Sequence, residues 1–322
     1  MKEKFGKNSE ASLDLKNIFI KKNDFLYADD QKINKQYLEQ PKRVSCMNCL
    51  SPIGDISFIK QEIPYSICEN CSHLNGLHQD TQEFAKSIYS EDKDEAYVEN
   101  YSAKTKEDYL KRVKEIYLPK ANFLYESLIE AGDHPNNYKI LDFGAGLGYF
   151  VSSLGQLDFK DIRGLEVSKS CVNFANTMMK KEYLSLFKFE ETKDILSHAD
   201  DEIISMIGVL EHLQNPYEII KTIKNNNKIK YIYISVPIFG IAVFLELFFP
   251  NIMHRQLSRD HTHLYTKKSL EWIINHFDMK AISAWWFGLD MVDLYRLGSV
   301  GLSKSQDDKV INIWQEIFQP LN

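Results

Sequence analysis

Four of the five cysteines fall into two close pairs, and their type and spacing point to chemistry. The pairs are Cys46-x2-Cys49 and Cys68-x2-Cys71, with 18 residues between them. Each pair supplies two thiolates from one tight turn, and two such turns complete the tetrahedral sulfur set that zinc prefers. Because four thiolates leave no open coordination position for a substrate, we expect a structural zinc ion.

A glycine-rich turn after an apolar run is the second candidate. Residues 140–148 place Asp142 before Gly144, Gly146 and Gly148. Glycines permit positive φ angles and let a ligand approach the backbone closely. In open α/β sheets, ligands bind beyond the carboxyl ends of the strands, where such turns lie. The G-x-G-x-G spacing differs from the dinucleotide pattern G-x-G-x-x-G and lacks the lysine of a P-loop. The alternative is an ordinary strand-to-helix turn.

This segment resembles motif I of the class I S-adenosylmethionine-dependent methyltransferases. The resemblance implies that Asp142 lies near the methionine ammonium of the cofactor and that the three glycines shape the loop around it. A second apolar run ends in Glu166, about 20 residues after the loop, where a carboxylate accepts ribose hydroxyls. Glu166 matches the ribose-binding acid of the family. Its alternative role is a surface charge at a strand end.

A third segment fits the same family. Residues 208–216 contain Leu210-Glu211-His212, and many class I methyltransferases place such a run next to the methyl donor. Packing ahead of the next helix is the alternative role for Glu211 and His212. Glu190 and Glu191 occupy the position at which an acid contacts adenine in the family.

The segment 254–265 holds three histidines, two arginines and a tyrosine. Histidine suits the removal of a proton from a hydroxyl or an acidic carbon near neutral pH. We therefore rank His261 as the leading candidate for a general base, with His263 and His212 behind it. The alternative is that His261 and His263 are structural residues that hold the apolar insertion at 238–253.

A zinc-binding module before a class I domain is similar to a group of methyltransferases that includes bacterial sugar C-methyltransferases. That group carries a Tyr-His-Glu-His-like run before the last helix. Here only its final histidine matches, at His261, and Asp260 keeps the acid, whereas Ser258 and Arg259 replace the tyrosine and the first histidine. The resemblance implies methyl transfer to a small polar acceptor, such as a nucleotide-linked or glycan sugar, with O- and C-methylation both open.

Two other function classes compete with methyl transfer. In the first, the zinc module recruits a partner, and the larger domain binds the cofactor without catalysis. In the second, the protein is a nucleotide-dependent oxidoreductase, which the spacing of the three glycines disfavours.

Alternating strand and helix patterns position these residues. From residue 138 onward, short apolar runs predict strands at 139–143, 162–167, 202–207, 231–236 and 281–287, and helices at 148–156, 169–180, 216–224 and 268–276. This alternation predicts an α/β fold, a Rossmann-like class I methyltransferase sheet with helices on both faces, preceded by a small zinc ribbon. We expect a flexible lead-in at 1–42, a zinc module at 43–80, a helical connector at 81–135, the methyltransferase domain at 136–300 and a C-terminal helix at 301–322.

Composition excludes several classes of protein. The 322 residues are 44% hydrophobic and 26% charged, which suits a globular core. The net charge of −6 disfavours a nucleic-acid partner.

The sequence shows neither a membrane span nor a signal peptide. The most apolar stretch is interrupted by Pro237, Glu246 and Pro250, so we expect no membrane span. The N-terminus lacks the apolar core of a signal peptide, so we expect a cytoplasmic protein. The insertion at 238–253 is a candidate lid, or a peripheral or homo-oligomeric contact.

Overall fold

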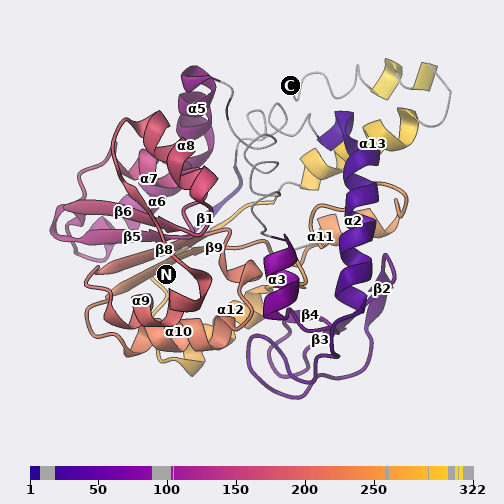
Figure 1. Cartoon of the computed structure of the whole chain (residues 1–322), viewed down its shortest axis with the longest axis horizontal. Helices are drawn as coiled ribbons and strands as arrows, with labels where there is room; N and C mark the ends of the chain where they lie inside the picture. The colour runs from indigo at the N-terminus through magenta and orange to yellow at the C-terminus, as the bar shows by residue number, and fades with distance from the viewer. Residues whose placement is uncertain are drawn as a thin grey trace. The chain divides into compact units, whose positions relative to one another are not determined.

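The computed structural model describes residues 1–7, 19–88, 103, 105–257, 261–288, 290–303, 309–310 and 312–314 (Figure 1). The chain divides into two compact units. The first comprises Met1–Lys2, Ala85–Val236 and Ile274–Ser283, and the second comprises Glu3–Phe84, Pro237–Ile273 and Ala284–Asn322.

A five-stranded parallel sheet forms the centre of the first unit, in the order β7-β6-β5-β8-β9. Its strands are β5 (Lys139–Phe143), β6 (Asp161–Glu166), β7 (Leu184–Leu186), β8 (Ile203–Ile207) and β9 (Tyr231–Ser235). The register pairs Asp142 on β5 with Gly164 on β6 and with Ser205 on β8. The predicted parallel α/β fold is thereby confirmed, although the three-residue strand β7 was not predicted.

Helices cover both faces of this sheet (Figure 1). On one side lie α5 (Lys106–Arg112), α6 (Leu118–Glu130), α7 (Tyr149–Leu154) and α8 (Lys169–Met179), and on the other lie α9 (Thr192–His198) and α10 (Pro216–Asn225). Fully buried Ile140 and Ile203 of the sheet pack against Phe150 and Leu154 of α7. The Ser168 hydroxyl caps α8 by accepting a hydrogen bond from the Cys171 N–H at 3.1 Å.

The second unit contains an antiparallel sheet in the order β10-β4-β3-β2. Its strands are β2 (Phe58–Lys60), β3 (Ile63–Ile67), β4 (Leu74–Gly76) and β10 (His263–Leu264). Its helices are α2 (Asn23–Leu38), α11 (Ile241–Leu247) and α13 (Asp290–Ser303), while α3 (Gln82–Ile88) and α12 (Lys267–His276) each contain a point where the chain passes between units. The fourth strand, β10, comes from the segment that follows the apolar insertion.

Two findings differ from the sequence-based expectations, and a third expectation lies mostly outside the described residues. Helix α2 lies inside the expected lead-in at 1–42, and its Ile33 and Tyr37 are buried. The strand predicted at 281–287 is β11 (Ser283–Trp286), but it pairs with β1 (Lys2–Phe5) in a separate two-stranded sheet and not with the parallel sheet. Helix α13 ends at Ser303, and most of the C-terminal helix expected at 301–322 falls outside the described residues.

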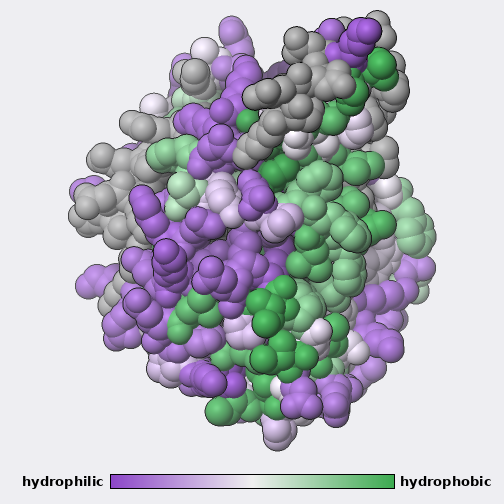
Figure 2. Space-filling view, turned by 90° about the vertical axis from the view of Figure 1, so that its right-hand side faces the viewer, coloured by the Kyte–Doolittle hydropathy of each residue, from purple (hydrophilic) through white to green (hydrophobic). Residues whose placement is uncertain are grey.

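None of the helices in the described ranges combines the length and apolar character that a bilayer crossing requires. The face shown in Figure 2 nevertheless carries a broad area of apolar residues. In the insertion, Ile241, Phe244 and Phe248 are exposed, and Phe248 keeps 78% of its surface accessible.

Candidate functional site

The loop after β5 owes its shape to three glycines with positive φ. A Cβ atom on Gly144 would lie 2.7 Å from Val209 Cγ2, and one on Gly148 would lie 2.8 Å from Ala175 Cβ, so close packing requires both glycines. Gly146, with φ of +52°, differs because a Cβ there would meet nothing within 4 Å. The backbone at Gly146 therefore faces open space that a ligand can occupy.

Asp142 supplies a buried carboxylate at the start of this loop. Its side chain is 2% exposed, and its Oδ1 accepts a hydrogen bond from Ser205 Oγ at 2.6 Å. Burial raises the pKa of Asp142 to about 7; Glu166 adds to this rise, while Ser205 and Lys120 oppose it. A cationic ligand group beside this carboxyl would stabilise its ionised form.

Glu166 ties the loop to the end of β6. Its Oε2 accepts a hydrogen bond from the Gly146 N–H at 2.7 Å, and its Oε1 accepts from the N–H groups of Val167 and Ser168, both at 2.9 Å. These three hydrogen bonds hold the Glu166 carboxylate against the loop, next to the open space at Gly146.

A pocket opens beside the loop, within the first unit. Its lining residues are Arg112, Tyr117, Asp142, Gly144, Ala145, Gly146, Leu147, Tyr149, Phe150, Ile207 and Gly208. One acidic and one basic residue, Asp142 and Arg112, thus line a pocket whose other lining residues are neutral. This combination suits a ligand that carries both an ammonium and a carboxylate group.

The sequence analysis did not assign Arg112 or Tyr117 to the cofactor site. The Arg112 guanidinium lies over the Tyr149 ring, 4.8 Å from its centroid, and Tyr149 stacks on Tyr109 and Tyr117 with ring centroids 4.7 and 5.3 Å apart. A π-helical turn, Val113–Tyr117, follows Arg112, and such turns are frequent at functional sites. In the sequence, Tyr109, Val113 and Tyr117 fall on one face of a helical pattern within the expected connector at 81–135.

The Leu210-Glu211-His212 run forms a short 3-10 turn after β8. Leu210 and Glu211 are buried, and His212 is half-buried. A Cβ on Gly208, which lines the pocket, would lie 3.6 Å from Glu211 Oε1, so this carboxylate is close to the pocket wall. By contrast, Glu191 caps its own turn, because its Oε2 accepts the Lys188 N–H at 2.8 Å.

The structure brings the four cysteines together in the second unit. Their sulfur atoms all lie within 4.8 Å of one another, with Cys46 Sγ 3.6 Å from Cys71 Sγ and Cys49 Sγ 3.5 Å from Cys68 Sγ. Tetrahedral zinc with Zn–S bonds of about 2.3 Å requires sulfur separations of about 3.8 Å. All four cysteines are free thiols. The cluster is therefore compatible with one metal ion.

Two of the candidate histidines differ in environment. His263 belongs to β10, is 1% exposed, and its Nδ1 lies 2.9 Å from Nε2 of buried His73. His261 is half-buried, with its Nδ1 3.3 Å from the Gln256 carbonyl oxygen. His212 belongs to the first unit. Of the substrate-side residues compared with the sugar C-methyltransferases, Ser258, Arg259 and Asp260 lie outside the described ranges.

The sequence of the chain matches a known family. The family described as "Methyltransferase domain" matches residues 109–284, which is more than half of the chain and includes the loop, Asp142 and Glu166. The chain belongs to this methyltransferase family. It is an S-adenosylmethionine-dependent methyltransferase with the class I fold.

Solved structures of other methyltransferases resemble this one. The methyltransferase domain of bacterial CtHen1-CN is 20% identical, covering 52% of this chain and 86% of that chain at a TM-score of 0.39. The plantazolicin methyltransferase BpumL, in complex with SAH and a monoazolic desmethylPZN analog, is 17% identical. The match covers 70% of this chain and 90% of that chain, with a TM-score of 0.41. Magnesium protoporphyrin IX methyltransferase (ChlM) from Synechocystis PCC 6803, with bound SAH, is 10% identical. The match covers 61% of this chain and 89% of that chain, with a TM-score of 0.42. A search of curated proteins finds no match.

Proposed function

We propose that this methyltransferase transfers the methyl group of S-adenosylmethionine to a small polar acceptor, with a nucleotide-linked or glycan sugar as the acceptor class. The observation that carries the cofactor assignment is the pocket beside Gly146, with Asp142 and Arg112 in its lining and Glu166 bonded to the loop. The acceptor class is supported by the four-cysteine module and His261, which resemble the corresponding parts of sugar methyltransferases.

The two charged groups of the cofactor's methionine part each have a complementary residue in the pocket lining. We assign the methionine ammonium to Asp142 and the methionine carboxylate to Arg112, because they line the same pocket with opposite charges. We assign the ribose hydroxyls to Glu166, because its carboxylate accepts the Gly146 N–H beside the open space and it matches the ribose-binding acid of the family. We assign Leu210 and Glu211 to the surroundings of the methyl donor, because they match the run that the family places there. When bound, the cofactor supplies an electrophilic methyl group.

The proton of the acceptor goes to His261 in this proposal. The Gln256 carbonyl can only accept a hydrogen bond, so Nδ1 of His261 carries the ring proton and Nε2 keeps its lone pair. A neutral imidazole in this tautomer is a suitable general base. His263 ranks lower because its ring is buried against His73, and His212 stays the third candidate.

We assign Zn²⁺ to Cys46, Cys49, Cys68 and Cys71 as a structural ion. The sulfur separations support this assignment, and four thiolates saturate the metal. Exposed Ile241, Phe244 and Phe248 support the proposal that residues 238–253 contact a second copy of the chain or another apolar surface.

Methyl transfer from labelled S-adenosylmethionine to a panel of nucleotide-linked sugars and glycans tests the proposed function. We expect label in at least one sugar with the wild-type chain and none with a Gly146→Val variant, whose side chain would fill the open space. Label in peptides or other non-sugar acceptors alone would contradict the acceptor class. Tight cofactor binding with no transfer to any acceptor would favour the non-catalytic, cofactor-binding alternative.

A further inference from the structure

The four-cysteine module, residues 43–80 and hereafter the cysteine module, shares its antiparallel sheet with the segment that carries His261. Strand β10 pairs antiparallel with β4, so that His263 lies opposite Asn75 and Leu264 lies opposite Leu74. The Gly76 N–H extends this pairing by donating to the Thr262 carbonyl at 2.8 Å. The residue directly after His261 is thus fixed to the module by backbone hydrogen bonds.

A largely shielded ion pair, Arg43–Asp80, holds Thr262 through its side chain. Asp80 Oδ2 accepts a hydrogen bond from Arg43 Nη2 at 2.8 Å and another from Thr262 Oγ1 at 2.9 Å. The side chains of Arg43 and Asp80 are only 8% and 12% exposed. Charge-assisted hydrogen bonds in such surroundings are stronger than those between neutral groups. Asp80 therefore anchors the chain on the C-terminal side of His261.

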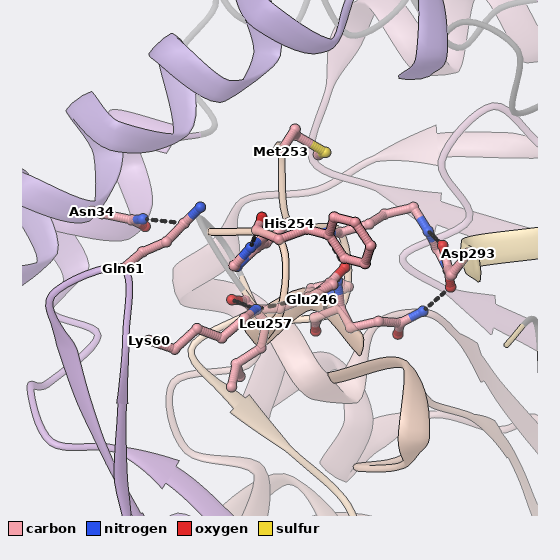
Figure 3. Close-up of polar contacts among 12 residues, drawn as sticks. Asn34, Lys60, Gln61, Glu246, Met253, His254, Leu257 and Asp293 are labelled. Atoms are coloured by element: carbon pink, nitrogen blue, oxygen red, sulfur yellow. Dashed lines mark hydrogen bonds and ion pairs between the residues drawn. The ribbon is translucent and has the colours of Figure 1, made fainter. Parts of the chain in front are cut away.

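A second anchor lies on the N-terminal side of His261 (Figure 3). Lys60, at the end of β2, is 1% exposed at its side chain, and its Nζ donates to the Leu257 carbonyl at 2.6 Å and to Glu246 Oε2 at 2.9 Å. Glu246 Oε1 accepts in turn from the N–H groups of Arg255 and Gln256, at 2.6 and 3.1 Å. Residues 255–257 are thus held by one buried lysine–glutamate pair.

Asn75 links these contacts to the cysteine cluster. Its Nδ2 lies 3.5 Å from Cys46 Sγ, and its Oδ1 accepts the Met47 N–H at 2.9 Å. Asn75 is fully buried and is also the residue of β4 that lies opposite His263. Asn75 therefore links the first cysteine turn, through its side chain, to strand β10, with which its own strand pairs.

We propose that the cysteine module positions the acceptor-side base: Lys60 and Asp80 are positioning residues that hold the chain at Leu257 and Thr262, one on each side of His261. This inference rests on the proposed role of His261. It assigns the cysteine module a part in acceptor chemistry, beyond stabilising its own fold. The two anchors restrict His261 to a backbone position in which its Nδ1 faces the Gln256 carbonyl.

Thr262→Val and Thr262→Ser test the proposal in the full chain. Valine keeps the shape and removes the hydroxyl, whereas serine keeps the hydroxyl. We expect amide hydrogen exchange over residues 261–266 to accelerate about tenfold in the valine variant, because one buried charge-assisted hydrogen bond is lost, and to return to the wild-type rate with serine. Exchange over residues 139–154 of the first unit serves as the internal reference.

The tautomer of His261 is the readout that a merely structural role would leave unchanged. In ¹⁵N spectra of histidine-labelled protein, we expect the Nδ1–H form in the wild type and the serine variant, and mixed tautomers in the valine variant. Removal of bound metal with a chelator should likewise accelerate exchange over 261–266. If the valine variant fails to fold, Asp80→Asn repeats the comparison. Glu69→Gln, which changes an exposed carboxylate on the same module, is its control.

Two outcomes would overturn the proposal. One is an unchanged exchange rate over 261–266 and an unchanged His261 tautomer in Thr262→Val and Asp80→Asn. The other is a loss of protection over residues 46–71 after chelation, with 261–266 still protected. Binding of S-adenosylhomocysteine, measured in parallel, separates this result from the proposed function, because the cofactor pocket lies in the first unit.

Discussion

Glu166→Gln is the substitution that best separates cofactor binding from folding. The carboxylate accepts three backbone hydrogen bonds, two at Oε1 and one, from Gly146, at Oε2. Glutamine has one acceptor oxygen, which we expect to face the two donors Val167 and Ser168. Its amide NH₂ then opposes the Gly146 N–H, and the loop loses the hydrogen bond that holds it.

The magnitude follows from that single lost contact. A hydrogen bond to a charged group contributes about 1.5–3 kcal/mol, so we expect binding of S-adenosylhomocysteine to weaken by about 2 kcal/mol, or roughly 30-fold in Kd. Isothermal titration calorimetry at neutral pH measures this change. A thermal melt of each variant shows whether the protein is folded.

Glu202→Gln is the matched control. Glu202 Oε2 accepts the Lys139 N–H at 2.9 Å, so it also holds a backbone amide of β5, but at the strand end away from the glycine loop. We expect the Kd of the Glu202→Gln variant for S-adenosylhomocysteine to stay within about twofold of wild type, since Glu202 holds the start of β5 and the loop follows its end. Equal affinity of Glu166→Gln and wild type would refute the assignment of Glu166 to the cofactor.

Four further predictions concern the cofactor loop, the buried acid, the metal and the base. Gly146→Val should abolish calorimetric binding of S-adenosylhomocysteine, whereas Gly132→Val, at another positive-φ glycine with open space, should leave it intact; equal binding by both would contradict the loop assignment. Because the pKa of Asp142 is raised to about 7, the fraction of Asp142 that is ionised increases as the pH rises towards 7. The ionised carboxylate is the form that attracts the ligand ammonium. Affinity should therefore increase between about pH 5.5 and 7, approaching tenfold per unit, and an equally steep rise in Asp142→Asn would contradict this origin. Elemental analysis should find about one zinc ion per chain, and chelation should destabilise the cysteine module first; metal-free protein with reduced thiols would refute the site. His261→Ala should keep cofactor affinity and lose about 10²–10⁴ in turnover at neutral pH, with partial recovery at higher pH where the acceptor ionises unaided; near-wild-type turnover would make His261 structural.

Local patterns predicted the strands and helices of the first unit well. The strand at residues 139–143 has the predicted bounds, since an apolar run ends at a glycine turn, and α8 and α10 each lie within one residue of prediction. Strand β7 was missed because three residues are too few to show a period. Helix α2 was missed because its sequence is mostly polar, although Ile33 and Tyr37 stand one turn apart and are buried.

Long-range pairing could not be predicted from these patterns. The sequence of β11 indicates a strand but not its partner, which is β1 at the other end of the chain. Likewise, 190 residues separate His73 from His263, and only the tertiary fold brings these two rings together. Arg112 escaped notice because a single arginine in an amphipathic helix is ordinarily a solvated charge.

Calorimetric titration of the wild-type chain with S-adenosylhomocysteine and, separately, with NAD tests the central claim most directly. The pocket beside Gly146, with Asp142 and Arg112 in its lining, predicts one S-adenosylhomocysteine per chain at about micromolar Kd, or roughly −8 kcal/mol. It predicts no measurable binding of NAD, because the G-x-G-x-G spacing is not that of a dinucleotide loop. Binding of NAD without binding of S-adenosylhomocysteine would contradict the account.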